Sequence, residues 1–217
     1  MNLQDYQREF LDFAIDIGVL RFGQFTLKFG RVSPYMFNTG WFDTGASLAK
    51  LGRYYAQTII NSGIEFDMIY GPAYKGILLA GATSIALADQ HNIDIPYAFN
   101  RKEIKDHGEG GLIVGSKLKG KVLVIDDVIS SGDAVKESVD IIQQAGASMS
   151  GVVIALDRQE RGSGTTSAIQ EVESEYDVRV ASIINLDIMI KYLEEKPEYN
   201  EHLQELPAYQ LQYGITG

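Results

Sequence analysis

The chain has 217 residues, 45% of them hydrophobic, and it carries 29 acidic against 19 basic side chains for a formal net charge of −10. A chain this acidic is a poor candidate for general binding to nucleic acid or to an anionic membrane, so an anionic ligand needs a local cluster of cations. The absence of cysteine excludes disulfides and thiolate metal sites. No signal peptide and no apolar run of roughly 20 residues is present, so we expect a cytoplasmic protein with no membrane partner.

The N-terminal part combines two helical patterns with an aromatic, glycine-rich insertion. Apolar residues recur at helical spacing over 6–19, and a second helix is predicted over 44–62, ending at Asn61-Ser62-Gly63. The residues between them, 20–43, are predicted to form short strands and turns, because glycines and Pro34 interrupt any long helix. We expect 20–43 to form a small hood.

The rest of the chain alternates between strand and helix. Strands are predicted over 66–71, 96–100, 121–126, 151–157 and 178–184, and helices over 76–91, 134–145 and 165–176. Residues 101–117 are charged and glycine-rich without apolar periodicity, and the tail from 186 is predicted to be helical with breaks at Pro197 and Pro207. This order indicates an α/β fold with a mostly parallel sheet flanked by helices, in one domain over 1–217. Ligands of such sheets bind beyond the carboxyl ends of the strands.

The stretch "VLVIDDVISSGDAV", 122–135, places polar residues at one such strand end. A turn that feeds a helix N-terminus aims several backbone N–H groups at one point, which suits a phosphate monoester. Asp126 and Asp127, just before the turn, are suited to accept hydrogen bonds from sugar hydroxyls or to bind Mg²⁺ through water. Together they describe a ribose 5-phosphate site, although Asp and Ser also occur in turns for purely local reasons. A near-match to a phosphate-binding P-loop at 115–122 has Val122 where Ser or Thr is required, and no strand is followed by GxGxxG.

Cations follow two other strands. "YGPAYKG", 70–76, combines Lys75 with a loop whose glycines and proline allow an unusual backbone, a fair anion site that could equally be a solvated loop. "NRKEIKDHGEGG", 100–111, holds Arg101, Lys102, Lys105 and His107 in a glycine-rich loop able to close over a ligand, or simply to stay in solvent.

Two further features suit a flat, anionic ring. Lys28 and Arg31 lie among aromatic residues of "FTLKFGRVSPYMFNTG", 25–40, a segment that could also be a small hydrophobic core. Arg158 directly follows the strand 151–157, where a guanidinium suits a bidentate grip on a carboxylate, or an ordinary salt bridge to Glu160. Each signal is weak alone, but all of them are predicted at one edge of the sheet.

These segments, in this order, resemble the bacterial orotate phosphoribosyltransferases over essentially the whole chain. "VIDDVISSGDA" alone resembles any type I phosphoribosyltransferase, whereas "NRKEIKDHGEGG" and "LKFGRVSPY" point to orotate. The resemblance implies transfer of the 5-phosphoribosyl group of 5-phosphoribosyl 1-diphosphate to orotate, giving orotidine 5′-monophosphate and diphosphate in UMP biosynthesis. It also implies Mg²⁺ held by diphosphate and waters without direct protein ligands, and a homodimer in which the 101–111 loop closes over the neighbour's site.

The resemblance further assigns roles to residues of this chain. The phosphoribosyl substrate would be bound by Lys28, Tyr74, Lys75, Arg101, Lys102, Lys105, His107, Asp126, Asp127, Val128, Ile129, Ser130, Ser131, Gly132, Asp133 and Ala134. Met36, Phe37, Ser130 and Arg158 would line the orotate pocket. Lys105, Arg101, Lys28 and Asp127 would be the catalytic residues, with Lys105 the most rate-sensitive.

The phosphate turn departs from the usual pattern of the family. It typically reads "TAGTA", whereas this chain has "SSGDA", which puts the Asp133 carboxylate where a phosphate is expected. Two anions at that range repel, so either Asp133 turns outward or affinity for the phosphoribosyl substrate falls. The competing hypotheses are a purine phosphoribosyltransferase, which would not need Lys28 and the aromatic hood, a regulator that binds the ligand without turnover, and a pure scaffold.

Overall fold

A six-stranded sheet forms the centre of the protein, in the order β5-β4-β3-β6-β7-β8. The computed structural model describes residues 3–27, 30–105, 111–162 and 164–215. Strands β3, β4, β6, β7 and β8 are parallel, and β5 pairs antiparallel with β4 at the edge. Their bounds are β3 Met68–Gly71, β4 Tyr97–Lys105, β5 Gly111–Gly115, β6 Lys121–Ile125, β7 Ser148–Asp157 and β8 Arg179–Asn185. The predicted α/β fold with a mostly parallel sheet is confirmed.

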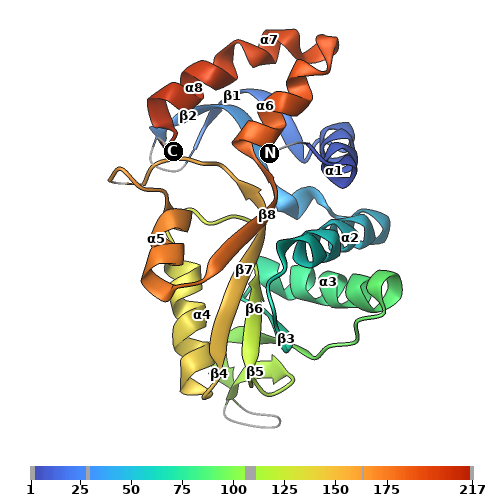
Figure 1. Cartoon of the computed structure of the whole chain (residues 1–217), viewed down its shortest axis with the longest axis vertical. Coiled ribbons are helices and arrows are strands. Elements are labelled where there is room, and N and C mark those ends of the chain that lie inside the picture. The colour runs from blue at the N-terminus through green and yellow to red at the C-terminus, as the bar shows by residue number, and fades with distance from the viewer. Residues whose placement is uncertain (1–2, 28–29, 106–110, 163, 216–217) are drawn as a thin grey trace.

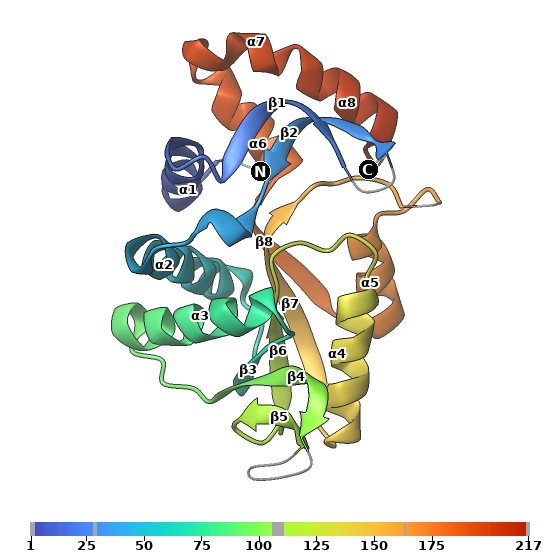
Figure 2. The ribbon, with the colours of Figure 1, turned by 180° about the vertical axis from the view of Figure 1, so that it is seen from behind.

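Helices cover both faces of this sheet, as Figures 1 and 2 show from opposite sides. Helices α2 (Gly45–Ser62) and α3 (Lys75–His91) pack on one face, and α4 (Asp133–Gln144) and α5 (Ala168–Tyr176) on the other. A strand covered on both sides must be apolar at consecutive positions, which explains the run from Val122 to Ile125, where no side chain is exposed.

A hood lies across the carboxyl end of the sheet, with both chain termini close to it (Figure 1). Its two-stranded antiparallel sheet is formed by β1 (Leu20–Thr26) and β2 (Val32–Phe37), followed by the short helix η2 (Thr39–Trp41). The remaining hood elements are helical and come from both ends of the chain: α1 Asp5–Asp16, α6 Leu186–Glu194, η3 Pro197–Tyr199, α7 Asn200–Leu203 and α8 Glu205–Tyr213.

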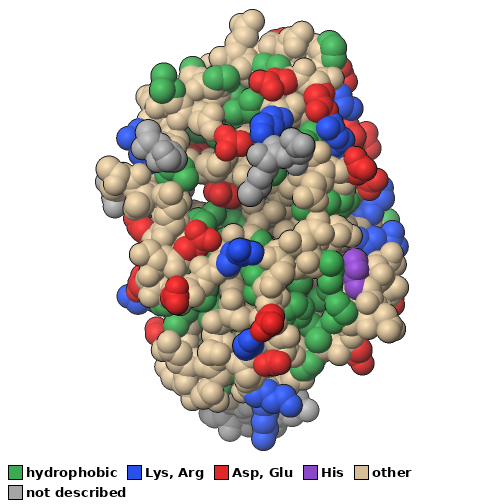
Figure 3. All heavy atoms as spheres, viewed as in Figure 1, with side chains coloured by type: hydrophobic (Ala, Val, Ile, Leu, Met, Phe, Trp, Pro, Cys, Tyr) green, Lys and Arg blue, Asp and Glu red, His purple; other side chains and the backbone are tan. Residues whose placement is uncertain are grey.

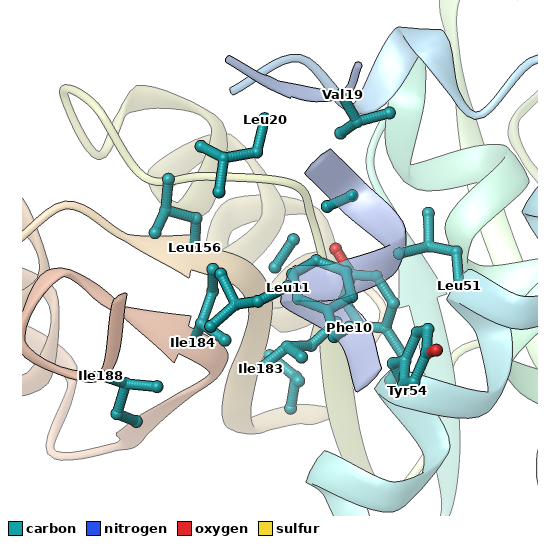
Figure 4. Close-up of a cluster of buried hydrophobic side chains, with 14 of the residues drawn as sticks. Phe10, Leu11, Val19, Leu20, Leu51, Tyr54, Leu156, Ile183, Ile184 and Ile188 are labelled. Atoms are coloured by element: carbon teal, nitrogen blue, oxygen red, sulfur yellow. The ribbon is translucent and has the colours of Figure 1, made fainter. Parts of the chain in front are cut away.

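One hydrophobic core joins the hood to the sheet (Figure 4). Phe10 and Leu11 of α1 point into a cluster with Leu51 of α2 and Ile184 of β8, and all four side chains are fully buried. The T-shaped contact of Phe10 with Tyr54, at 5.3 Å between ring centroids, adds directional packing to this burial. The hood and the sheet therefore share one buried core, which fixes the hood in position relative to the carboxyl end of the sheet.

Two predictions about the elements are wrong. Residues 101–117 contain strand structure, because β4 continues to Lys105 and β5 pairs back onto it from Gly111. Pro207 does not break a helix: it is the third residue of α8, and proline is tolerated in a first turn because the N–H groups there have no intrahelical partner. Within the described ranges no helix is long and apolar enough to cross a membrane.

Candidate active site

The turn between β6 and α4 supplies the acidic side chains and a helix N-terminus. Asp126 and Asp127 follow β6 directly, and the chain turns through Gly132 into α4 at Asp133. Gly132 has a φ of 77°, a left-handed conformation that residues with a Cβ rarely adopt, and it caps the helix. The first backbone N–H groups of α4 are thereby left for a ligand, as a phosphate site requires.

Asp127 lies where three parts of the chain meet. Its side chain accepts hydrogen bonds from Lys75 Nζ at 2.5 Å and from Thr39 Oγ1 at 2.8 Å. Lys75 begins α3 and Thr39 belongs to the hood, so the carboxylate ties the sheet edge, the β3–α3 loop and the hood together. The structure thus brings together Asp127 and Lys75, which lie 52 residues apart in the chain.

Asp126 is held by backbone contacts and has an altered acidity. Its backbone N–H donates to the Val153 carbonyl, its carbonyl accepts from Tyr55 Oη at 2.8 Å, and its Oδ1 accepts from the Asp127 N–H at 2.9 Å. Burial, and to a smaller extent the neighbouring Asp127 carboxylate, raises the pKa of Asp126 to about 7. Near neutral pH, Asp126 is therefore poised between its protonated and ionised forms.

The loop between β3 and α3 follows a path that only small residues allow. A Cβ on Gly71 would lie 2.0 Å from the Gly76 carbonyl oxygen. The end of β3 and the start of α3 thus approach too closely for any side chain at position 71. The buried side chain of Asn100 accepts a hydrogen bond from the Ala73 N–H at 2.8 Å and fixes the loop from β4. Tyr74 is 73% exposed and Lys75 reaches back to Asp127, so the loop presents its polar side to the site.

Strands β4 and β5 form a hairpin that carries the predicted cationic loop. Arg101 Nη1 donates to the Gly111 carbonyl at 3.1 Å, and Lys102 forms an exposed ion pair of 3.3 Å with Glu137 of α4. Lys105 is the last residue of β4, so its backbone is placed by the hairpin. His107 lies outside the described residues, as does Lys28.

Asp133 has a partner inside the phosphate turn. Ser131 Oγ donates to Asp133 Oδ2 at 2.8 Å, and both residues are exposed. The hydrogen bond directs the carboxylate along the turn. Val128 and Ile129 are partly buried against the hydrophobic clusters on the two faces of the sheet, whereas Ser130 and Ala134 are exposed at the rim of the turn.

Arg158 lies at the opposite side of the site, under the hood. Its Nε donates to Glu160 at 2.7 Å and its Nη2 donates to Ser33 Oγ at 2.8 Å, while its guanidinium lies 4.1 Å from the centroid of the Tyr35 ring. The predicted salt bridge of Arg158 to Glu160 is present, and it uses only one edge of the guanidinium.

Met36 and Phe37 are the last residues of β2 and are both half-buried. Phe37 packs against Phe10 with ring centroids 6.2 Å apart, so part of its surface belongs to the core. Met36 pairs with Arg21 across the hood sheet.

Figure 3 shows acidic and basic side chains intermixed over one face of the molecule, which is hollowed between the hood and the sheet.

Sequence reasoning missed several residues that organise this site. Thr39, Tyr55 and Asn100 hold Asp127, Asp126 and the 71–76 loop, respectively. Thr39 and Asn100 lie within the segments 25–40 and 100–111, but a single threonine, tyrosine or asparagine carries no signal of the partner it meets after folding. No group of three or more His, Asp or Glu side chains able to hold a metal ion occurs among the residues that the structure describes.

Comparisons with known proteins agree with this geometry. The family model described as "Phosphoribosyl transferase domain" matches residues 42–189. The orotate phosphoribosyltransferase of Shigella flexneri is 58% identical over 213 residues, which cover 98% of this chain and 100% of that protein. The solved structure of the Francisella tularensis orotate phosphoribosyltransferase has a TM-score of 0.87 and 42% identity, covering 95% of this chain and 99% of that one. The Mycobacterium tuberculosis enzyme in complex with 5-phospho-α-D-ribosyl 1-diphosphate shares the fold at a TM-score of 0.62 and 22% identity, covering 84% of this chain and 98% of that one.

Proposed function

The chain belongs to the orotate phosphoribosyltransferases of the phosphoribosyl transferase family, and from this premise we propose how its residues share the work of the reaction. It transfers the 5-phosphoribosyl group from 5-phosphoribosyl 1-diphosphate to orotate, giving orotidine 5′-monophosphate and diphosphate in pyrimidine biosynthesis. The 58% identity to orotate enzymes over the full chain decides against the purine, regulatory and scaffold alternatives.

The acidic turn and the helix N-terminus bind the ribose 5-phosphate part of the substrate. Asp126 and Asp127 accept hydrogen bonds from the ribose hydroxyls, and the backbone over 128–134 donates to the 5-phosphate. The observation that carries this assignment is the convergence of Lys75, Thr39 and Asp127 at the carboxyl end of β6. When substrate binds, Lys75 exchanges the Asp127 carboxylate for diphosphate, because both partners are anions within reach of the same ammonium group.

Cations around the β3–α3 loop and the β4–β5 hairpin neutralise the leaving diphosphate. As the bond from C1 of the ribose to diphosphate breaks and the bond from C1 to the orotate nitrogen forms, negative charge grows on diphosphate and positive charge on the sugar. Lys28, Tyr74, Lys75, Arg101, Lys102, Lys105 and His107 contact the phosphoribosyl substrate, and Lys28, Arg101 and Lys105 act with Asp127 as catalytic residues. Catalysis then consists of positioning and charge stabilisation, with no covalent role for the protein.

Magnesium fits this donor set as an ion held by the substrate. The two adjacent carboxylates of Asp126 and Asp127 offer oxygen atoms that suit a hard cation reached through water. When bound, Mg²⁺ supplies further positive charge to diphosphate. Asp126 and Asp127 orient the ribose end, and they do so best when both are ionised.

The orotate ring binds between Arg158 and the hood. The guanidinium of Arg158 faces the ring, Ser130 borders it from the phosphate turn, and Met36 and Phe37 line the hood side. Support comes from the position of Arg158 at the end of β7, on the same sheet edge as Asp127 at the end of β6. A cation here suits orotate, which is a carboxylate at neutral pH.

A homodimer is proposed from the exposed apolar surface along α3. Leu78 and Ile85 are 62% and 65% exposed, and with Tyr97, which is 41% exposed, they border a groove of about 380 Å³ between α2 and α3. Exposed side chains of this size on one helix face mark an interaction surface. In the dimer the hairpin carrying 101–111 closes over the site of the neighbouring subunit.

The cytoplasmic location of the protein stays a prediction.

The loss of orotate absorbance on adding 5-phosphoribosyl 1-diphosphate and Mg²⁺ tests the function directly. We expect turnover with orotate and none with adenine, hypoxanthine or uracil run in parallel. Turnover of another base would contradict the assignment of Arg158 and the hood to orotate. Binding without turnover of any base would contradict the catalytic assignment.

A further inference from the structure

We propose that Glu160 and Tyr209 are positioning residues of the base pocket, which hold the Arg158 guanidinium in place for the substrate carboxylate. The inference rests on the proposed role of Arg158 as the group that grips orotate. The C-terminal helix α8 would then take part in selecting an acidic base, although it lies far along the chain from every proposed substrate contact.

The Glu160 carboxylate is the centre of this arrangement. It accepts hydrogen bonds from Arg158 Nε, from Arg31 Nη1 and from Tyr209 Oη, each at 2.7 Å. Its side chain is only 13% exposed, so water competes little for these three contacts. Three charged or polar groups from three separate parts of the chain are therefore fixed by one carboxylate.

Arg158 is held on two of its three nitrogen atoms. Nε is held by Glu160, and Nη2 donates to Ser33 Oγ at 2.8 Å and to Tyr209 Oη at 3.3 Å. Nη1 makes no hydrogen bond to any residue in the described part of the chain. The Tyr35 ring supports the flat face of the guanidinium, which leaves Nη1 with a defined direction and an unused donor edge.

A buried hydroxyl beside this guanidinium also lacks a partner. Tyr35 is fully buried, and its hydroxyl has no hydrogen bond among the described residues. Buried polar groups are nearly always paired in folded proteins. The established contribution of Tyr35 is its ring, on which the Arg158 guanidinium lies.

The C-terminal helix is anchored at this corner by backbone pairing. Arg161 N–H donates to the Tyr213 carbonyl at 2.8 Å, and Ile215 N–H donates to the Gln159 carbonyl at 2.9 Å. The segment 159–161 is thus clamped to the end of α8, which carries Tyr209. The position of Glu160 depends on α8 and not only on its neighbour Arg158.

The charge balance explains the preference for an acidic base. Arg31 and Arg158 share the single carboxylate of Glu160, so the corner retains one positive charge among these three groups. A ring with a carboxylate neutralises that charge, whereas uracil, which lacks the carboxylate, leaves it unpaired. A guanidinium already held in position also loses little freedom when the ligand arrives.

The variant Tyr209→Phe tests the inference, because it removes the hydroxyl and keeps the ring contacts with Tyr35 and Tyr213. We expect the KM for orotate to rise about three- to tenfold and the preference for orotate over uracil to fall, with the KM for 5-phosphoribosyl 1-diphosphate unchanged. Tyr213→Phe is the matched control on the same helix, since the Tyr213 hydroxyl contacts only Gln212 among the described residues. Glu160→Gln, assayed by direct orotate binding, is the second variant.

The possible outcomes separate this inference from the function on which it rests. Arg158→Gln should weaken orotate binding more than either positioning variant. If it does, but Tyr209→Phe and Glu160→Gln bind orotate like the parent enzyme, the positioning role is wrong. If Arg158→Gln itself binds orotate normally, the proposed role of Arg158 fails, and the positioning role fails with it.

Discussion

The pKa of Asp126 links the acidity of one side chain to the stability of the fold. Burial, together with the Asp127 carboxylate, raises this pKa from 3.8 to about 7. The folded protein therefore binds a proton more tightly than the unfolded chain does. The resulting stabilisation is fully present below pH 3.8 and is lost as the pH rises through about 7.

The change Asp126→Asn should remove this pH dependence, because an amide does not ionise. At pH 8 the variant should exceed the parent protein in free energy of unfolding by about 4 kcal/mol, and the difference should fall below about 1 kcal/mol near pH 4. Urea unfolding at both pH values measures it. Equal stability of the two proteins at pH 8 would mean that Asp126 is solvated in the folded state.

The carboxylate of Asp133 should weaken binding of the phosphoribosyl substrate. It lies at the first residue of α4, beside the proposed 5-phosphate site, where two anions repel. Asp133→Thr should therefore lower the KM for this substrate several-fold, with the KM for orotate unchanged. Asp140→Thr, the same change at an exposed position further along α4, is the control. An unchanged KM would mean that the hydrogen bond from Ser131 already keeps the carboxylate away from the phosphate.

Among the elements, the β4–β5 hairpin pairs in regular register only at the start of β4. The first residues of β4, from Tyr97 to Asn100, pair with β3 or β5, whereas the pairing register with β5 is interrupted between Asn100 and Lys105. The exposed ion pair of Lys102 with Glu137 contributes little to holding the hairpin against α4. We therefore expect that the hairpin closes over a ligand without disturbing the core.

Lys105→Ala should lower kcat at least a hundredfold without unfolding the protein, because the proposed role of Lys105 is to neutralise charge on the leaving diphosphate. Lys117→Ala, at an exposed lysine just after β5, is the matched control and should leave kcat unchanged. Steady-state kinetics and thermal unfolding measure the two effects. Near-normal turnover of Lys105→Ala would remove this residue from the catalytic set.

Prediction from sequence succeeded for elements whose signal is local. The helix 44–62 and the strand 121–126 have a clear apolar pattern and clear end signals, and both were found within a residue or so. Strand β5 was missed because its five residues begin and end with glycine and none of its side chains is fully buried. It becomes a strand by pairing with β4, which is a tertiary contact.

At the scale of the whole molecule, the groove between α2 and α3 should be covered by a second copy of the chain. Ile85→Glu places a charge in this apolar surface, so we expect sedimentation to show a shift from dimer to monomer and turnover to fall with it. Ile60→Glu, at an exposed position of α2 away from the groove, is the control. A parent protein that sediments as a monomer would contradict the dimer.

Mixing two inactive variants tests whether the hairpin acts across the interface. Lys105→Ala removes the proposed loop function and Asp127→Asn the proposed ribose contact, so a mixed dimer contains one intact site if the loop acts in trans. We expect refolded mixtures to recover activity that neither variant has alone. No recovery, with mixed dimers present, would place the loop over its own subunit.

Sequence alone specifies the alternation of strands and helices and the polar turns that follow β3, β6 and β7. These features depend on local periodicity, and the parallel arrangement then brings the turns to one edge of the sheet. Which side chains meet there depends on tertiary packing: Thr39 with Asp127, Ser33 with Arg158, and Tyr209 with Glu160, separated by 88, 125 and 49 residues. These pairs form because the buried core fixes the position of the hood on the sheet. The packing energy is spread over many core residues, and no single one of them indicates in the sequence which polar side chains will meet.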